Sequence, residues 1–460
     1  MISSVNPATE ETLAEFEPWS DGQVDDAVGR VATAQRTWKT MSVEERAVPL
    51  RRVAELLRER SERYGALITS EMGKPIVEAE AEVNKCALAC DHYAEHAAEY
   101  LADHQVATES LSSYVAYEPL GIVLAIMPWN FPFWQVFRAG APTLMAGNGI
   151  VLKHASNVPQ SALACEEVLR DAAFPESLLR TVIVAGADTE RLIDDDRIAA
   201  VTLTGSSEVG ARIASLAAGR LKKQVLELGG SDPFIVLADA DLEYAARTAA
   251  RARNQNNGQS CIAAKRFIVE EPVADEFGAL FADAVRALRV GDPSSRDTNV
   301  GPLARADLRE TLERQVSDSR GMGAEAIVGG EPVPGRGYFY APTILDGVTA
   351  TMPAFHEETF GPVAALIRAR DADHAVQLAN DTEYGLGAAV WTRDLDGAKD
   401  IARRIQAGSV FVNGLVASDP RMPMGGVKRS GYGRELGRHG IWEFTNIQTV
   451  RIAPAEGPAG

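Results

Sequence analysis

The chain has 460 residues, of which 46% are hydrophobic and 24% charged, a composition typical of a globular enzyme with about two or three domains. Its net charge of −18, without any basic run, argues against nucleic-acid binding. Apolar stretches are all shorter than the ~18 residues of a membrane span, the N-terminus lacks the pattern of a signal peptide, and four cysteines do not make a disulfide framework. We therefore expect a cytoplasmic protein that does not bind a membrane.

The first hundred or so residues predict long helices. From about Gly22 to Tyr100, charged and apolar residues alternate at helical spacing, which is typical of amphipathic helices. Residues 112–118 then alternate with a period of two and predict an exposed strand.

One part of this helical segment contains residue types that bind metals: Cys86, Cys90, His92 and His96. At ~100° per residue the two cysteines share a face, and the histidines point well away from it. One helix cannot gather all four side chains around an ion. We expect a structural role for them and no metal site.

Short apolar runs separated by helical stretches follow. They lie at 122–126, 149–152, 181–184 and 200–203, and again at 266–269, 363–367 and 409–412. This rhythm predicts buried parallel strands joined by crossover helices, and so two α/β domains. The tail at 453–460 is predicted to be disordered.

Two segments suggest covalent chemistry. Cys261 lies in a loop of small and amide-bearing residues, three positions after Gly258, a residue that lets the backbone approach a ligand closely. Glu227 ends an apolar run, in front of two glycines. A cysteine thiolate is a strong nucleophile and a carboxylate can act as a general base. Taken alone, these residues are equally well interpreted as a small buried side chain and a turn residue.

Five motifs in a fixed order extend this interpretation. They are Met127–Pro132 (MPWNFP), Thr204–Gly210 (TGSSEVG), Leu226–Gly230 (LELGG), Gly258–Cys261 (GQSC) and Glu357–Pro362 (EETFGP). In these motifs the chain resembles the aldehyde dehydrogenase superfamily, from Asn6 to about Gln448, and it looks most like the short bacterial succinate-semialdehyde dehydrogenases.

The resemblance implies an α/β fold with two Rossmann-like domains and a small β unit. Residues 1–108 and 122–228 would form the cofactor-binding domain and 229–435 the catalytic domain. Residues 109–121 and 440–453 would form the bridging unit that joins subunits into a homodimer or homotetramer.

The resemblance also implies roles for three catalytic residues. Cys261 would attack the aldehyde carbon, and the Asn130 side-chain amide with the Cys261 backbone N–H would stabilise the oxyanion. Glu227 would activate the water that hydrolyses the thioester. From its own neighbours, Asn130 would be interpreted as a turn residue between two prolines.

The dinucleotide site departs from the usual fingerprint, since Gly205–Gly210 (GSSEVG) replaces Gly-x-Gly-x-x-Gly. A helix that starts after the strand at 201–203 would still direct backbone N–H groups at a pyrophosphate. The resemblance assigns the cofactor to Trp129, Lys153, Gly205, Ser206, Glu358 and Phe360.

Ser156 predicts which cofactor binds. Many NAD-using relatives have a glutamate at this position, where its carboxylate would repel a 2′-phosphate. At ~4 Å and an effective dielectric of ~20, two unit charges interact by about 4 kcal/mol. Serine removes that repulsion and Lys153 adds positive charge. We therefore expect NADP to be preferred, with NAD possible.

Arg138 predicts the substrate, because semialdehyde-oxidising relatives carry an arginine at this position for the distal carboxylate. The alternative interpretation is a surface helix charge. Some relatives place a second arginine where this chain has Gln255, and Ser418 or Arg421 could replace it. Succinate semialdehyde is therefore the expected substrate.

Three alternatives remain open at this point: another or broader semialdehyde specificity, a CoA-acylating dehydrogenase and a non-catalytic, crystallin-like member of the family. The carboxylate at 227 favours hydrolysis over CoA transfer. The joint presence of Asn130, Glu227, Cys261 and Glu358 favours an active enzyme.

Overall fold

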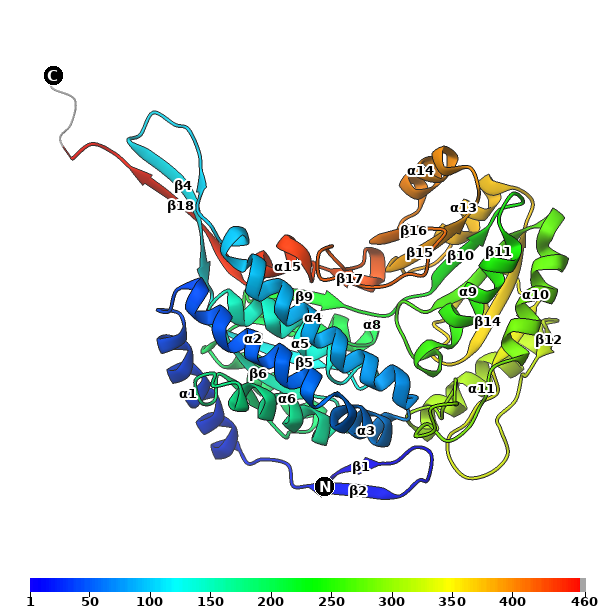
Figure 1. The fold of residues 1–460 in the computed structure, drawn as a ribbon, viewed down its shortest axis with the longest axis horizontal. Coiled ribbons are helices and arrows are strands. Elements are labelled where there is room, and N and C mark those ends of the chain that lie inside the picture. The colour runs from blue at the N-terminus through cyan, green and yellow to red at the C-terminus, as the bar shows by residue number, and fades with distance from the viewer. Residues whose placement is uncertain (456–460) are drawn as a thin grey trace.

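Two sheets of mostly parallel strands form the frame of the protein (Figure 1). The computed structural model describes residues 1–455, so the predicted disordered tail at 453–460 lies largely outside the described residues. Among residues 1–455, no helix is long and apolar enough to cross a membrane.

The first sheet has the strand order β17-β9-β8-β5-β6-β7. Its strands are β5 (Ile122–Met127), β6 (Gly149–His154), β7 (Leu179–Thr181), β8 (Ile198–Thr204), β9 (Lys223–Glu227) and β17 (Gly431–Tyr432). All neighbours pair in parallel except β17 and β9. β5 is buried at every position, as expected for a strand covered on both faces.

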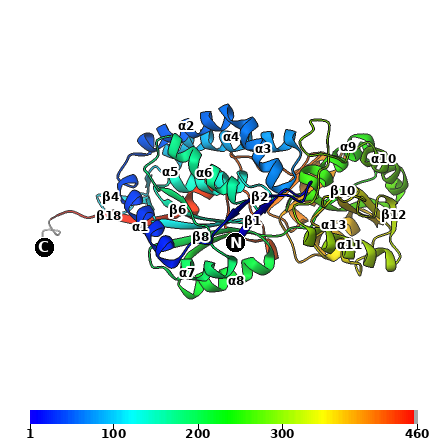
Figure 2. The same cartoon turned by 90° about the horizontal axis from the view of Figure 1, so that it is seen from below.

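Helices cover both faces of this sheet (Figure 2). The helices of this lobe are α1 (Asp21–Trp38), α2 (Val43–Glu59), α3 (Ser61–Met72), α4 (Ile76–Tyr100), α5 (Trp134–Met145), α6 (Pro159–Asp171), α7 (Thr189–Asp194) and α8 (Ser207–Gly219). α5 and α6 lie against one face of the sheet, and α2, α3 and α4 pack outside them. The predicted N-terminal helices are thereby confirmed. α1 and α2 each begin with a capping box, formed by Ser20 with Gln23 and by Ser42 with Glu45, which satisfies N–H groups that a helix start leaves free.

The second sheet has the order β12-β13-β14-β11-β10-β15-β16, with β12 antiparallel to its neighbour. Its strands are β10 (Asp232–Val236), β11 (Ala264–Glu270), β12 (Glu325–Val328), β13 (Thr343–Asp346), β14 (Val363–Ala369), β15 (Gly387–Trp391) and β16 (Ser409–Val412). Its helices are α9 (Leu242–Asn254), α10 (Ala274–Arg286), α11 (Ala306–Gly321), α12 (Pro353–His356), α13 (Ala372–Asn380) and α14 (Leu395–Arg404). The two predicted α/β units correspond to these two sheets.

A third sheet projects from the first lobe as an arm (Figure 1). It consists of β4 (Ser112–Pro119) between β3 (His104–Gln105) and β18 (Thr445–Ile452), all antiparallel. A short helix, α15 (Gly437–Glu443), leads into β18, and a hairpin of β1 (Ile2–Val5) and β2 (Thr12–Phe16) begins the chain.

Three details differ from the sequence-based expectation. β3 lies in the arm although it precedes residue 109, and β17 joins the first sheet although it precedes residue 435. The apolar run at 181–184 is a strand only up to Thr181. Val182 still donates a backbone hydrogen bond to Leu152 O, and the chain then turns away toward α7 with its apolar side chains buried. Burial alone does not distinguish a strand from a packed loop.

Candidate active site

The predicted residues of the first lobe lie at the carboxyl ends of its parallel strands. Asn130 follows β5, Lys153 lies in β6, Gly205 follows β8, and Glu227 ends β9. The strand register places Glu227 opposite Thr204, so the ends of β8 and β9 are level. Open α/β sheets bind ligands at this edge.

Strained backbone shapes the loop before the predicted nucleophile. Asn256 (φ 54°) and Asn257 (φ 57°) are both left-handed, a conformation that asparagine tolerates better than most residues. The Asn257 side chain fixes the turn, because its Nδ2 donates to Gly73 O at 2.8 Å and Pro302 O at 2.9 Å. Gly258 (φ 74°) lies against Gly361, where a Cβ would come within 2.3 Å of the backbone. Only glycine fits there.

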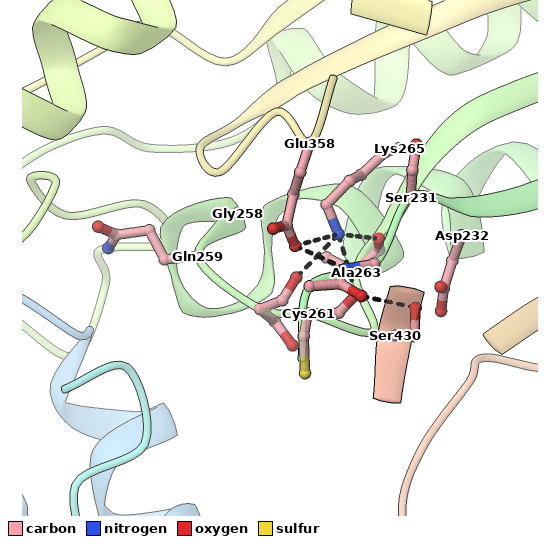
Figure 3. A network of polar contacts seen from close by, with 12 residues as sticks. Ser231, Asp232, Gly258, Gln259, Cys261, Ala263, Lys265, Glu358 and Ser430 are labelled. Carbon is pink, nitrogen blue, oxygen red and sulfur yellow. Dashed lines mark hydrogen bonds and ion pairs between the residues drawn. The ribbon is translucent and has the colours of Figure 1, made fainter. Parts of the chain in front are cut away.

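Lys265 supports the same loop from inside (Figure 3). Its fully buried Nζ donates to the carbonyl oxygens of Ser260 at 3.1 Å, Cys261 at 3.0 Å and Ala263 at 3.1 Å. Its remaining neighbour is Glu358, with an N–O distance of 3.8 Å. Sequence reasoning missed Lys265, because a lysine inside a strand gives no local sign of which carbonyls it meets.

Cys261 lies on the wall of a cavity of about 290 Å³. Its side chain is partly accessible there, whereas the other three cysteines are buried: Cys86, Cys90 and Cys165. The two cysteines of α4 lie in the hydrophobic core. Among residues 1–455, no cluster of three or more His, Cys, Asp or Glu side chains has a geometry that holds a metal.

Electrostatics around Cys261 act in opposite directions. Desolvation raises the pKa of its thiol to about 12, against the opposing effect of the Arg138 and Lys265 charges. Desolvation also raises the pKa of Glu227, which Arg138 again opposes and Glu435 reinforces. The Glu227 charge also acts on the thiol, and a carboxyl group whose pKa is raised toward neutrality is suited to act as a general base.

Glu227 is buried, and neither of its carboxylate oxygens has a hydrogen-bond donor among residues 1–455. Gly425 lies against it, so that a Cβ at that position would come within 2.9 Å of Oε1. Glu227 is not part of the wall of the Cys261 cavity. A buried carboxylate without donors is costly in a purely structural role, which favours a functional one.

Asn130 is held beside the nucleophile loop. Its Nδ2 donates to Gln259 O at 3.1 Å, and its backbone oxygen accepts from Asn256 Nδ2 at 2.8 Å. His154 holds the far end of the same turn, since its Nδ1 accepts from Ala155 N and its Nε2 lies 2.9 Å from Pro132 O. The Asn130 amide has a second N–H that is free to serve an oxyanion.

Arg138 differs from the expected free cation. It lies in the cavity wall but is 1% exposed and forms an ion pair with Glu435. Its Nη2 donates to Thr204 Oγ1 at 3.1 Å, whereas Nη1 meets only the Met424 sulfur at 3.8 Å. Because a thioether is a weak acceptor, Nη1 is the atom that can still serve a ligand. The surface-charge interpretation of Arg138 is wrong, since the side chain is buried.

The two suggested replacements for a second arginine lie in different places. Ser418 lines the cavity, as does Gln255. The Arg421 side chain is 77% exposed and pairs with Asp419, and it does not reach the cavity wall. The carboxylate of Asp419, two residues away in the sequence, holds the Arg421 guanidinium outside the cavity. A cation that the sequence analysis missed, Lys85 of α4, does line the cavity.

The predicted cofactor residues surround the same edge of the first sheet. Ser206 is the N-cap of α8, where its Oγ accepts from Val209 N at 3.3 Å. Lys153 is partly exposed and Ser156 exposed. Glu358 accepts a hydrogen bond from Gly230 N at 2.9 Å. Trp129 and Phe360 meet edge to face, with centroids 5.7 Å apart.

Residues 1–450 match the model of the aldehyde dehydrogenase family, and the chain belongs to this family. A Synechocystis protein named probable succinate-semialdehyde dehydrogenase [NADP(+)] is 50% identical over 98% of this chain and all of that protein. The Escherichia coli succinate semialdehyde dehydrogenase [NAD(P)+] Sad is 48% identical over 97% of each chain.

Solved structures agree with this assignment. Succinic semialdehyde dehydrogenase from Streptococcus pyogenes, in complex with NADP+, superposes with a TM-score of 0.96 at 36% identity, over 99% of this chain and all of that one. Gox0499, whose structure was studied for cofactor and substrate selection, has a TM-score of 0.97 at 40% identity, over 98% and 99% of the two chains. The predicted fold class is confirmed.

Proposed function

We propose that this protein is an NADP-preferring aldehyde dehydrogenase that oxidises succinate semialdehyde to succinate. The observation that carries the proposal is a cavity that contains both a cysteine nucleophile and cationic side chains, in a chain of this family. The cavity volume of about 290 Å³ is at the small end of the usual ~300–1,000 Å³, which suits a short substrate.

Residues of both lobes fit NADP+. The start of α8 at Ser206 offers backbone N–H groups to a pyrophosphate. Lys153 has no carboxylate partner among residues 1–455 and would face the adenosine 2′-phosphate together with Ser156. Glu358 and Phe360 would hold the nicotinamide ribose and ring. When bound, the cofactor supplies the acceptor for the hydride.

The residues of the chain then divide the reaction into two easier steps. Cys261 Sγ bonds to the aldehyde carbon as a thiolate, once its proton has passed to solvent through the cavity. The resulting oxyanion receives hydrogen bonds from Asn130 Nδ2 and the Cys261 backbone N–H. Loss of hydride leaves a thioester, and water that gives its proton to Glu227 hydrolyses it, releasing the acid and the thiol.

The distal carboxylate of the substrate would meet Arg138 Nη1, the guanidinium nitrogen that faces only Met424. A charged hydrogen bond at a buried site contributes about 1.5–3 kcal/mol. Ser418 supplies a hydroxyl in the same cavity. A site of this kind distinguishes an anionic aldehyde from a neutral one of equal length.

The test is a panel of aldehydes, with succinate semialdehyde, glutarate semialdehyde and butanal each assayed with NADP+ and NAD+. We expect the highest kcat/KM for succinate semialdehyde with NADP+. An equal kcat/KM for butanal would refute the substrate, and a preference for NAD+ would refute the cofactor.

We also propose a homodimer or homotetramer assembled through the arm. β18 is an eight-residue edge strand, and the arm exposes the apolar side chains of Leu111, Ile447 and Ile452. An exposed edge strand of this length is a template for pairing with another chain. Light scattering of Ile447→Asp against the wild type tests it, and an unchanged mass would contradict this role of the arm. Such an oligomer is expected to work in the cytoplasm.

A further inference from the structure

Lys85 is a partly buried cation in the cavity wall that forms no ion pair of its own within residues 1–455. It lies on the face of α4 that carries Glu78, Glu82 and Lys85 at helical spacing, and all three side chains line the Cys261 cavity. Glu82 is occupied, because it pairs with the buried Lys74 and accepts from Phe133 N and Trp134 N. Glu78 accepts from Asn256 N at 2.6 Å. Both acids therefore have partners elsewhere.

The Lys85 ammonium group contacts a hydroxyl and an aromatic ring. Its Nζ donates to Ser418 Oγ at 2.6 Å and lies 4.5 Å from the centroid of the Trp134 ring. No carboxylate of residues 1–455 lies within ion-pair distance of Nζ. An ammonium has three N–H donors, so two remain available.

A second positive charge lies close to Lys85. Burial, and then the charge of Arg138, lower the pKa of Lys85 to about 8. Two cations that face one small cavity repel each other until an anion lies between them. The Ser418 hydroxyl can keep accepting from Lys85 while its own proton points to that anion.

We propose that Lys85, with Ser418, binds the distal carboxylate of the substrate. Lys85 thereby takes the place of the second arginine that some relatives have at the position of Gln255. This inference rests on the proposed function, because it names a residue that determines its substrate specificity. Arg138 and Lys85 then hold the carboxylate from two elements, α5 and α4.

A competing cation lies in the same cavity wall. Arg251 of α9 is exposed and lines the cavity too. Lys85 is favoured over it because Lys85 is partly buried, where a charge pair is less screened by water. Arg251→Met therefore serves as the discriminating comparison, and exposed Lys39→Met serves as the control for the same change in net charge.

The experiment measures kcat/KM for succinate semialdehyde and for butanal with NADP+ in the purified full chain. Lys85→Met should lose on the order of ten- to a hundredfold with succinate semialdehyde, mainly through KM, and only a fewfold with butanal. Lys85→Arg should recover most of the activity. Lys39→Met and Arg251→Met should stay within a fewfold of wild type. A loss that is equal for both aldehydes, or that occurs only in Arg251→Met, overturns the inference.

Succinate is a second probe, since it carries the carboxylate without the reactive aldehyde. Its inhibition constant against butanal should rise about tenfold or more in Lys85→Met. An unchanged constant, or no inhibition of the wild type, overturns the role of Lys85. If the wild type prefers butanal, the proposed substrate fails, yet succinate inhibition still decides whether Lys85 binds a carboxylate. Melting curves show whether Lys85→Met folds. If it does not fold, the kcat/KM and the succinate inhibition constant of Lys85→Arg decide whether a cation at this position binds the carboxylate.

Discussion

Substitution of Arg138 by Met should destabilise the protein through a defined partner. Arg138 and Glu435 form an ion pair in which both side chains are at most 3% exposed. Removing one member of a buried pair leaves an uncompensated charge and costs about 3–5 kcal/mol. Arg138→Met should therefore unfold at a clearly lower urea concentration. The double variant Arg138→Met/Glu435→Gln removes both charges, and we expect it to regain most of that loss.

The stability that Arg138→Met loses should also depend on pH. Burial raises the pKa values of Glu435 and Glu227, and Arg138 opposes both shifts. A carboxyl group whose pKa is raised by folding binds its proton more tightly in the folded state. Its contribution to stability is present at low pH and is lost as pH rises through the folded pKa. Without Arg138 both shifts increase, so Arg138→Met should lose more stability at about pH 8 than at about pH 5.

The assay is urea unfolding followed by tryptophan fluorescence at both pH values, combined with kinetics. If Arg138 also binds substrate, the double variant will be stable yet still weak on succinate semialdehyde relative to butanal. A wild-type midpoint for Arg138→Met, or a double variant no more stable than the single one, would refute the buried pair as the origin of the effect.

Three further predictions concern the catalytic and cofactor residues. Cys261→Ser should fold but lose dehydrogenase activity, whereas alanine at each buried cysteine should leave turnover measurable; steady-state rates test this, and the cysteines are Cys86, Cys90 and Cys165. Because burial raises the pKa values of the Cys261 thiol and of Glu227, kcat/KM should rise with pH above neutrality, and a wild-type profile that is flat there would contradict the base role. Ser156→Glu should shift the NADP/NAD ratio of kcat/KM toward NAD on the order of tenfold, since exposure screens the ~4 kcal/mol repulsion to about 1–2 kcal/mol; an unchanged ratio would place the 2′-phosphate elsewhere.

The sequence predicted the frame of the protein because buried parallel strands read as short apolar runs. It also indicated Cys261 as a candidate nucleophile, through its place in the ordered motifs of the family, and the structure places this side chain on the cavity wall. Residues 182–184 were wrongly predicted as part of a strand for the same reason that the other strands were predicted correctly. An apolar run indicates that a segment is buried, and it does not show whether the segment pairs with another strand.

The partners of the charged residues were much harder to predict. Glu435 meets Arg138 from a distant part of the chain, and no local pattern in the sequence joins them. Lys265 acts through backbone carbonyls, which every residue has. Lys85 did leave a weak signal, since the spacing of Glu78, Glu82 and Lys85 places three charged residues on one face of α4. Arg421 was suggested as a substrate-binding residue, but its ion pair with Asp419 holds it outside the cavity.

The most direct test of the central claim is the mass of the peptide that carries Cys261. Glu227→Gln would be mixed with succinate semialdehyde and NADP+ and quenched in acid during the first turnover. The proposed mechanism predicts one succinyl group on Cys261, formed together with one equivalent of NADPH, because acylation proceeds and hydrolysis is slow. An unmodified Cys261 with steady NADPH formation, or a succinyl group on another residue, would contradict it.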